Sequence, residues 1–141
     1  MRVENIRVVY ATKTKHSKKI AEDISLALNV QAQNVTDNPR VEETELLFIV
    51  GGIYGGDSLP ELLNFVHDLD AKKIGKAALV TSCASKKQGQ TKVRKILEEK
   101  GIEIVDELLC QGSFLFFKWG RPNQADVQEA VDFARRLQEG L

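Results

Sequence analysis

Three hydroxyl side chains stand close together near the start of the chain, at Thr12, Thr14 and Ser17. They lie between an apolar run at 6–10 and an amphipathic run at 17–28. Where a strand leads into a helix, exposed N–H groups and the positive end of the helix dipole attract anions, and hydroxyls add donors without adding charge. The spacing therefore predicts a phosphate site. A helix cap at Ser17, with the two threonines as turn residues, would produce the same pattern.

Other reactive groups are sparse in the sequence. It contains neither the Gly-x-x-x-x-Gly-Lys-[Ser/Thr] motif of P-loops nor the Gly-x-Gly-x-x-Gly motif of dinucleotide-binding folds. His16 is expected to contribute a backbone amide and His67 to lie on a helix surface, so no nucleophile–base pair and no catalytic residue is indicated. Cys83 and Cys110 are expected on or beside neighbouring strands, either as a redox pair or as small buried side chains. The cysteines and histidines do not have metal-ligand spacing.

Short apolar runs alternate with amphipathic runs along the chain, which predicts strands alternating with helices. The run 46–50 is uninterrupted, as expected for a strand covered on both faces. The pattern predicts an α/β fold, a three-layer doubly wound sandwich around a five-stranded parallel sheet in the order 2-1-3-4-5. A single domain of residues 1–141 is expected. The expected strands are 6–10, 30–35, 46–50, 77–80 and 102–110, and the expected helices are 17–28, one opening at 58–61, 93–100 and one following 122–123.

Local signals predict where several elements begin and end. Ser58 and Glu61 have the spacing of a capping box, and Gly101 suits the position just past a helix end. The last strand is expected to be interrupted near Asp106 and Glu107. The buried stripe of the first helix is predicted at Ile20, Ile24, Ala27 and Leu28, and that of the last helix at Val127, Ala130, Val131, Ala134 and Leu137.

In this strand order, ligands bind beyond the carboxyl ends of the strands, where the winding reverses around strands 1 and 3. Four segments leave those ends, at 11–17, 51–58, 82–89 and 111–121. We therefore expect any binding site to be built from these four segments.

Two of these segments resemble those of a known family. Thr12-x-Thr14-Lys15-x-Ser17 is similar to the flavodoxin phosphate loop, [Ser/Thr]-x-Thr-Gly-x-[Thr/Ser]. Gly-Ile-Tyr-Gly-Gly-Asp-Ser at 52–58 resembles the flavodoxin loop after strand 3, where an aromatic residue followed by glycine packs against the isoalloxazine ring. The whole chain resembles the short-chain flavodoxin layout, without an insertion in strand 5.

The resemblance implies that the chain binds FMN. Hydroxyls of the first segment would bind the phosphate, and its other residues would offer backbone N–H groups. Tyr54 would stack on the ring with its neighbours at the ring edge, and the segment 81–85 would border the pyrimidine side. The residues so implied are Thr12, Lys13, Thr14, Lys15, His16, Ser17, Gly52, Ile53, Tyr54, Gly55, Ser82, Cys83, Ala84 and Ser85.

The implied function is electron transfer by a flavodoxin-like flavoprotein, to a redox protein or a small-molecule acceptor. An FMN-dependent quinone or porphyrinogen oxidoreductase on the same fold is one alternative. A flavin-free module that binds a partner is another. The oligomeric state is left open.

The chain departs from the flavodoxin pattern at two places. Lys15 replaces the usual glycine of the phosphate loop, which costs about 1 kcal/mol if that position needs a positive φ. The third segment lacks the acid and the second aromatic residue often found there, and has Ser85-Lys86-Lys87 instead.

Lysine and arginine residues gather in the segments expected at this edge, with Asp57 as the clearest opposing acid. At an effective dielectric constant near 20, a positive charge about 8 Å away stabilises an anionic reduced flavin by about 2 kcal/mol before screening. One hypothesis is therefore a less negative reduction potential than in acidic flavodoxins, and the alternative is a solvated rim. The residues concerned are Lys13, Lys15, Lys18, Lys19, Lys86, Lys87, Lys118 and Arg121.

Four aromatic residues occur between Phe114 and Trp119, in a segment bounded by Gly112 and Gly120. Core packing of two or three of them is one interpretation. A lid in which Trp119 or Phe116 covers the flavin ring is another, and a docking patch for a partner is a third.

Composition excludes several broad classes of protein. Hydrophobic residues make up 43% of the 141 residues and charged residues 28%, as in ordinary globular proteins and unlike disordered chains. The 20 basic and 20 acidic residues balance, which argues against a uniformly basic nucleic-acid binder. No apolar run approaches the roughly 20 residues that span a bilayer. With no secretory signal evident at residues 1–5, a cytoplasmic location is expected.

Overall fold

The computed structural model describes residues 5–13, 15–54, 57–82, 89–110 and 124–141, and the side chains of residues 124–127 are left aside. A five-stranded parallel sheet has the order β2-β1-β3-β4-β5, which confirms the predicted fold class and strand order. The strands are β1 (Ile6–Tyr10), β2 (Ala32–Asn34), β3 (Thr44–Gly52), β4 (Ile74–Ser82) and β5 (Glu103–Cys110). The α-helices are α1 (His16–Leu28), α2 (Pro60–His67), α3 (Thr91–Glu99) and α4 (Gln124–Glu139), and the 3₁₀ turns are Val35–Asp37 and Ala71–Lys73.

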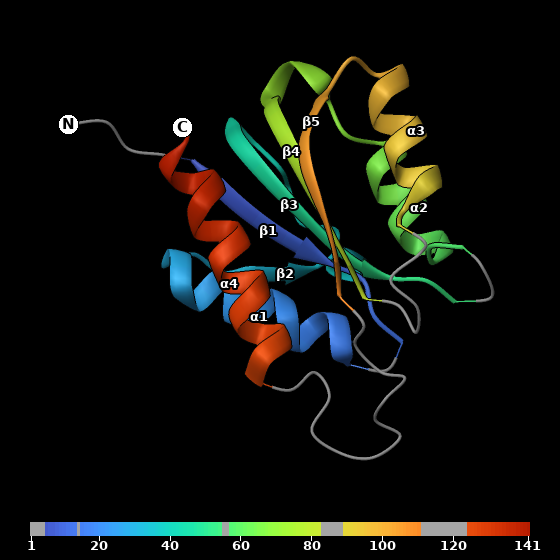
Figure 1. The fold of residues 1–141 in the computed structure, drawn as a ribbon. Coiled ribbons are helices and arrows are strands. Elements are labelled where there is room, and N and C mark those ends of the chain that lie inside the picture. The colour runs from blue at the N-terminus through green and yellow to red at the C-terminus, as the bar shows by residue number, and fades with distance from the viewer. Residues whose placement is uncertain (1–4, 14, 55–56, 83–88, 111–123) are drawn as a thin grey trace.

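Helices cover both faces of the sheet, with α1 and α4 on one face and α2 and α3 on the other (Figure 1). Successive side chains of a strand point to opposite faces, so the apolar run of β3 contributes side chains to two hydrophobic cores, one on each face of the sheet. Phe48 and Val50 pack toward α1 and α4, whereas Leu47 and Ile49 pack toward α2 and α3. All four side chains are fully buried, as predicted for a strand covered on both faces.

The amphipathic helices present much of the apolar faces that the sequence predicts. Ile20, Ile24 and Leu28 of α1 are buried, as are Ala130 and Ala134 of α4. The predicted stripe of α4 missed Phe133, which is buried and packs edge-on against Phe48 with ring centroids 6.4 Å apart. Four predicted positions differ or lie outside the description: Ala27, Val131 and Leu137 are only partly buried, and the side chain of Val127 is not described.

Two helix ends test the predicted caps. Gly101 has φ +79° and follows the last turn of α3, which confirms it as the glycine past the helix end. The capping box at Ser58 and Glu61 is wrong. The helix begins at Pro60, whose fixed φ suits the first helical position, so Leu59 is the N-cap and Glu61 comes one residue too early. The Ser58 hydroxyl is buried and caps nothing.

Three strands differ clearly from their predicted extents: β3 and β4 extend at both ends beyond 46–50 and 77–80, and β2 is shorter than predicted. The second strand is shorter than 30–35 because the Asn34 side chain accepts the Thr36 N–H at 2.9 Å and begins a 3₁₀ turn. In β5 the register shifts, so that Ile104 pairs with Ala77 and Asp106 with Ala78. The predicted interruption is therefore only partly right: β5 runs unbroken from Glu103 to Cys110, and the irregularity is a register shift just before Asp106. Beyond it, Asp106 contacts Arg136 of α4, and Glu107 contacts Arg94 of α3 on the opposite face.

Among the helices that the structure describes, none is long and apolar enough to cross a membrane. Among all the described residues, no group of three or more histidine, cysteine or acidic side chains is arranged to hold a metal ion.

The central role of Phe48 leads to a stability prediction. Phe48→Ala removes a fully buried ring and is expected to lower the free energy of unfolding by about 3–5 kcal/mol, measured by chemical denaturation. Leu26→Ala is the control, because Leu26 is 81% exposed and should change stability by less than about 0.5 kcal/mol. Equal effects of the two substitutions would contradict the described core.

Candidate functional site

The carboxyl ends of three neighbouring strands bring the predicted binding segments to one edge of the sheet (Figure 1). Beyond β1, the Ala11 N–H donates to the Val50 carbonyl at 3.0 Å. Beyond β3, the Ile53 N–H donates to the Ser82 carbonyl at 3.2 Å. The first segment is therefore tied to β3, and the second segment is tied to the end of β4. This edge includes the point between β1 and β3 where the winding of the sheet reverses.

The segment between β1 and α1 is folded by its own polar groups. The Lys15 N–H donates to the Thr12 Oγ1 at 2.8 Å, which closes a tight turn. Lys15 itself has φ 73° and ψ −3°, a left-handed conformation that favours glycine. The position occupied by Lys15 therefore does need a positive φ, so the cost of about 1 kcal/mol considered in the sequence analysis applies. Thr14 lies outside the described residues.

Ser17 provides the feature of this segment that most favours a ligand. It is the second residue of α1 and fully buried, and its Oγ has no hydrogen-bond partner among the described residues. The alternative role for Ser17, as a helix cap, is wrong because Lys15 occupies the N-cap position and makes no side-chain cap. Leaving a buried hydroxyl unpaired costs about 1–3 kcal/mol, and an anion at the helix N-terminus would satisfy it.

Tyr54 joins the second segment to the first. Its hydroxyl accepts the Lys13 N–H at 3.2 Å, and the Lys13 Nζ lies 5.8 Å from the ring centroid. The ring lies over Gly52 so closely that a Cβ there would come within 2.7–2.9 Å of three Tyr54 atoms. Backbone hydrogen bonds of 2.8 and 3.2 Å between Tyr54 and Asp57 hold the base of the turn. Gly52 is therefore needed for the close approach of Tyr54.

Two of the backbone amides predicted to face a phosphate are already paired within the protein. Lys13 donates to Tyr54, and Lys15 donates to Thr12. His16 is the first residue of α1. The Thr12 and Ser17 hydroxyls and the helix N-terminus, rather than these two amides, are thus the described parts of the segment available to an anion.

The charges predicted around the site are partly neutralised. Asp57 pairs with Lys92 of α3 at 3.2 Å, and Lys19 pairs with Asp23 one helical turn away at 2.9 Å. Lys15 and Lys18 are exposed at the start of α1. The remaining predicted cations, Lys86, Lys87, Lys118 and Arg121, lie outside the described residues, as does the aromatic segment 114–119.

The third segment is described only at its two ends. Ser82 is buried at the end of β4, whereas Cys83, Ala84, Ser85 and Gly55 of the predicted site lie outside the described residues. Cys110, proposed as a redox partner of Cys83, is buried on β5.

A polar cluster that the sequence analysis missed connects the two ends of the third segment. It consists of Thr81, Gln90, Arg94 and Glu107, joined by hydrogen bonds and an ion pair. The available signal was a glutamate in the middle of an otherwise strand-like run, which was interpreted only as an interruption of the strand.

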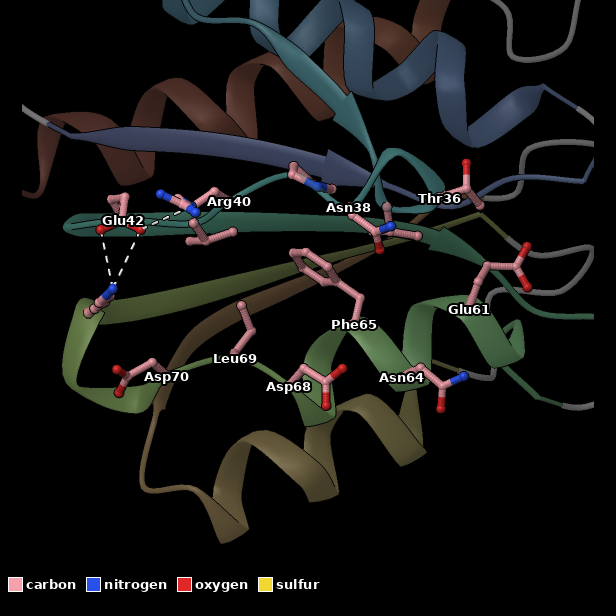
Figure 2. A pocket seen from close by; sticks show the side chains of 14 residues that line it. Thr36, Asn38, Arg40, Glu42, Glu61, Asn64, Phe65, Asp68, Leu69 and Asp70 are labelled. Carbon is pink, nitrogen blue, oxygen red and sulfur yellow. Dashed lines mark hydrogen bonds and ion pairs between the residues drawn. The ribbon is translucent and has the colours of Figure 1, made fainter.

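A hollow formed by described residues lies away from these segments (Figure 2). It has a volume of about 730 Å³ and separates the segment after β2 from α2. Phe65 and Leu69 line it, and at one end Glu42 is paired with Lys73 at 3.2 Å and Arg40 at 4.0 Å. Since none of the predicted site residues lines it, this hollow does not define the candidate site.

The fold and the edge together define a class: a doubly wound α/β protein with a candidate anion site after its first strand. The sequence model of the flavodoxin domain matches residues 7–114 of the chain. The protein belongs to the flavodoxin family, whose members are FMN-binding flavoproteins.

Solved structures show the same architecture. A flavodoxin from the domain Archaea superposes with a TM-score of 0.69 at 18% identity, covering 95% of this chain and 99% of that one. A short-chain flavodoxin associated with a bacterial microcompartment gives 0.70 at 18% identity, covering 98% and 99%. An azoreductase from Bacillus anthracis gives 0.68 at 9% identity, covering 99% and 100%. These similarities show the fold. No curated protein sequence matches the chain.

The left-handed backbone at Lys15 leads to a second prediction. Lys15→Gly should raise the free energy of unfolding by about 1 kcal/mol, because glycine has no Cβ to strain at φ 73°. Lys15→Ala is the matched control, since it removes the ammonium group and keeps the Cβ, and it should leave stability within about 0.5 kcal/mol. Equal stabilisation by both variants would assign the gain to lost charge instead of relieved backbone strain.

Proposed function

We propose that this protein is an electron-transfer flavoprotein that holds the phosphate of FMN in the segment between β1 and α1. The observation that carries the proposal is the buried, unpartnered Ser17 hydroxyl at the N-terminus of α1, next to a residue in the glycine-type conformation. The flavodoxin family to which the chain belongs supports FMN as the cofactor.

Three features would bind the phosphate. The Thr12 oxygen accepts the Lys15 N–H, which leaves the hydroxyl hydrogen of Thr12 free to donate to a phosphate oxygen. Ser17 would donate from the first turn of α1, and the helix dipole adds the equivalent of about half a positive charge there. No carboxylate stands in this first turn to oppose the anion.

Tyr54 would stack against the flavin ring. It already lies across the ends of β1 and β3, in contact with Gly52 and Lys13. An aromatic contact of this kind contributes about 1 kcal/mol, so the ring contact supplements the phosphate contacts and cannot replace them. The Lys13 N–H could exchange the Tyr54 hydroxyl for a phosphate oxygen as its acceptor, which would couple the two halves of the site.

Bound FMN would supply the redox chemistry, and the protein would supply binding and orientation. The chain's own residues would hold the phosphate, cover the ring and bring local positive charge near it. A redox protein or a small-molecule electron acceptor would complete the reaction.

Ligand titration with matched serine variants tests the proposal. The purified protein should bind FMN much more tightly than riboflavin, which lacks the phosphate. Ser17→Ala should weaken FMN binding about 10- to 100-fold, as expected for a hydrogen bond to a charged group, and should leave riboflavin binding unchanged.

Ser25→Ala is the control, because Ser25 is also buried and unpartnered on α1 but lies beyond its first turn. Removing either orphan hydroxyl should affect the ligand-free protein similarly. A protein that binds no FMN at micromolar concentrations would refute the proposal, and equal losses in the two variants would refute the role of Ser17.

A substrate-reducing enzyme on the same fold is the second candidate function. The 20 basic and 20 acidic residues favour this candidate, because the protein lacks the strong net charge that would steer it toward one oppositely charged redox protein. Steady-state assays of the FMN-loaded protein with a quinone and a chemical or nicotinamide reductant separate the two. Saturable, catalytic quinone reduction would establish an enzyme, and slow, unsaturable electron exchange an electron carrier.

A further inference from the structure

Glu107 is a largely buried carboxylate that joins three elements. Its side chain, 18% exposed, extends from β5 toward the face covered by α3. Oε1 pairs with the Arg94 Nη2 of α3 at 2.8 Å. Oε2 accepts the Gln90 N–H at 3.1 Å and the Thr81 hydroxyl at 3.4 Å. A buried charge persists in a fold when it is paired and hydrogen-bonded, and here both oxygens are used.

Gln90 fastens the same cluster to the sheet. Its side chain is fully buried, and Nε2 lies within 3.0–3.2 Å of the Val80 carbonyl, the Ile49 carbonyl and the Thr81 hydroxyl. The opposite amide orientation would point Oε1 at two carbonyl oxygens, so the donor side must face the strands. The residue that immediately precedes α3 is therefore bound to the carboxyl ends of β3 and β4.

These contacts hold together the two residues that flank the third segment of the predicted cofactor site. Thr81 and Gln90 stand at its two ends and bond to each other and to Glu107. The Ser82 carbonyl accepts the Ile53 N–H of the second segment at 3.2 Å. A Cβ on Gly89 would lie 2.1 Å from the Glu107 Oε2, so the carboxylate reaches Thr81 and Gln90 only because residue 89 is glycine.

We propose that Glu107 is a positioning residue for the ring side of the flavin site. It fixes Thr81, Ser82 and Gln90 relative to one another, and thereby sets where the third segment meets the second, beside Tyr54. This inference rests on the proposed FMN function. The phosphate contacts lie in a different segment, after β1, so Glu107 acts on the part of the cofactor that FMN and riboflavin share.

The experiment compares Glu107→Ala with Asp106→Ala in the full-length protein. Asp106 is the adjacent acid; its side chain pairs with Arg136 of α4 at 3.0 Å on the other side of the sheet and accepts from Glu107 only the backbone N–H, at 2.8 Å, so its removal leaves the Glu107 side-chain contacts in place. Dissociation constants for FMN and for riboflavin, the visible circular dichroism of bound FMN and its reduction potential are measured for each protein.

Glu107→Ala should raise both dissociation constants by the same factor, about tenfold, and change the visible circular dichroism and the potential. Asp106→Ala should leave all of these as in the unaltered protein. Glu107→Gln retains an oxygen that can accept the Gln90 N–H, so it should recover part of the affinity for both ligands.

Two results would overturn the positioning role while leaving FMN binding intact. One is a Glu107→Ala protein with lower thermal stability but unaltered affinities, spectrum and potential. The other is a loss confined to FMN, which would place the effect on the phosphate. If Glu107→Ala does not fold, Glu107→Gln and Arg94→Met decide, and unaltered flavin binding in both overturns the role. If the unaltered protein binds neither flavin, the proposed function itself fails, and this inference fails with it.

Discussion

Parallel pairing of β1, β3 and β4 between two helical layers is the constraint on which the rest of the structure depends. Parallel strands need crossovers through helices, and helices on both faces leave the sheet no solvated side. The pairing places the carboxyl ends of all three strands at one edge, where backbone groups leave the ladder and must find other partners. The binding segments lie there because of this geometry, whichever residues they carry.

Several local conflicts in the structure lie near this edge, although others, such as the unpaired Ser25 hydroxyl on α1, lie elsewhere. Lys15 adopts a left-handed backbone, and the Ser17 and Ser58 hydroxyls are buried without partners. The Gln90 Oε1 is likewise unpaired. A protein whose levels of structure otherwise agree tends to accept such conflicts where function requires them. The stable sheet tolerates these local costs, and a bound phosphate would remove the one at Ser17.

The first two segments of the site are joined before any ligand is considered. Tyr54 contacts Lys13 through both its hydroxyl and its ring, and Gly52 allows this approach by having no side chain. The third segment is joined to the second through the Ile53 N–H and to α3 through Glu107. The three segments of the candidate site are therefore connected along one edge of the sheet, and a structural change in one segment is expected to alter the position of the next.

The sequence by itself determined the fold class, the strand order and the buried run of β3, because the periodicity of apolar residues is a local property that already separates strands from helices. It also predicted Gly101 just past a helix end, whereas the positive φ of Lys15 was only a condition attached to the flavodoxin resemblance. The capping box at Ser58, the burial of Phe133 and the cluster around Glu107 were decided only by the tertiary structure. Each of these features depends on contacts between residues that are far apart in the chain. The elements that pack against a side chain decide whether a serine caps a helix, a phenylalanine is buried or a glutamate in a strand is paired. Glu107, for example, meets Thr81, Gln90 and Arg94 only after β4, α3 and β5 have assembled.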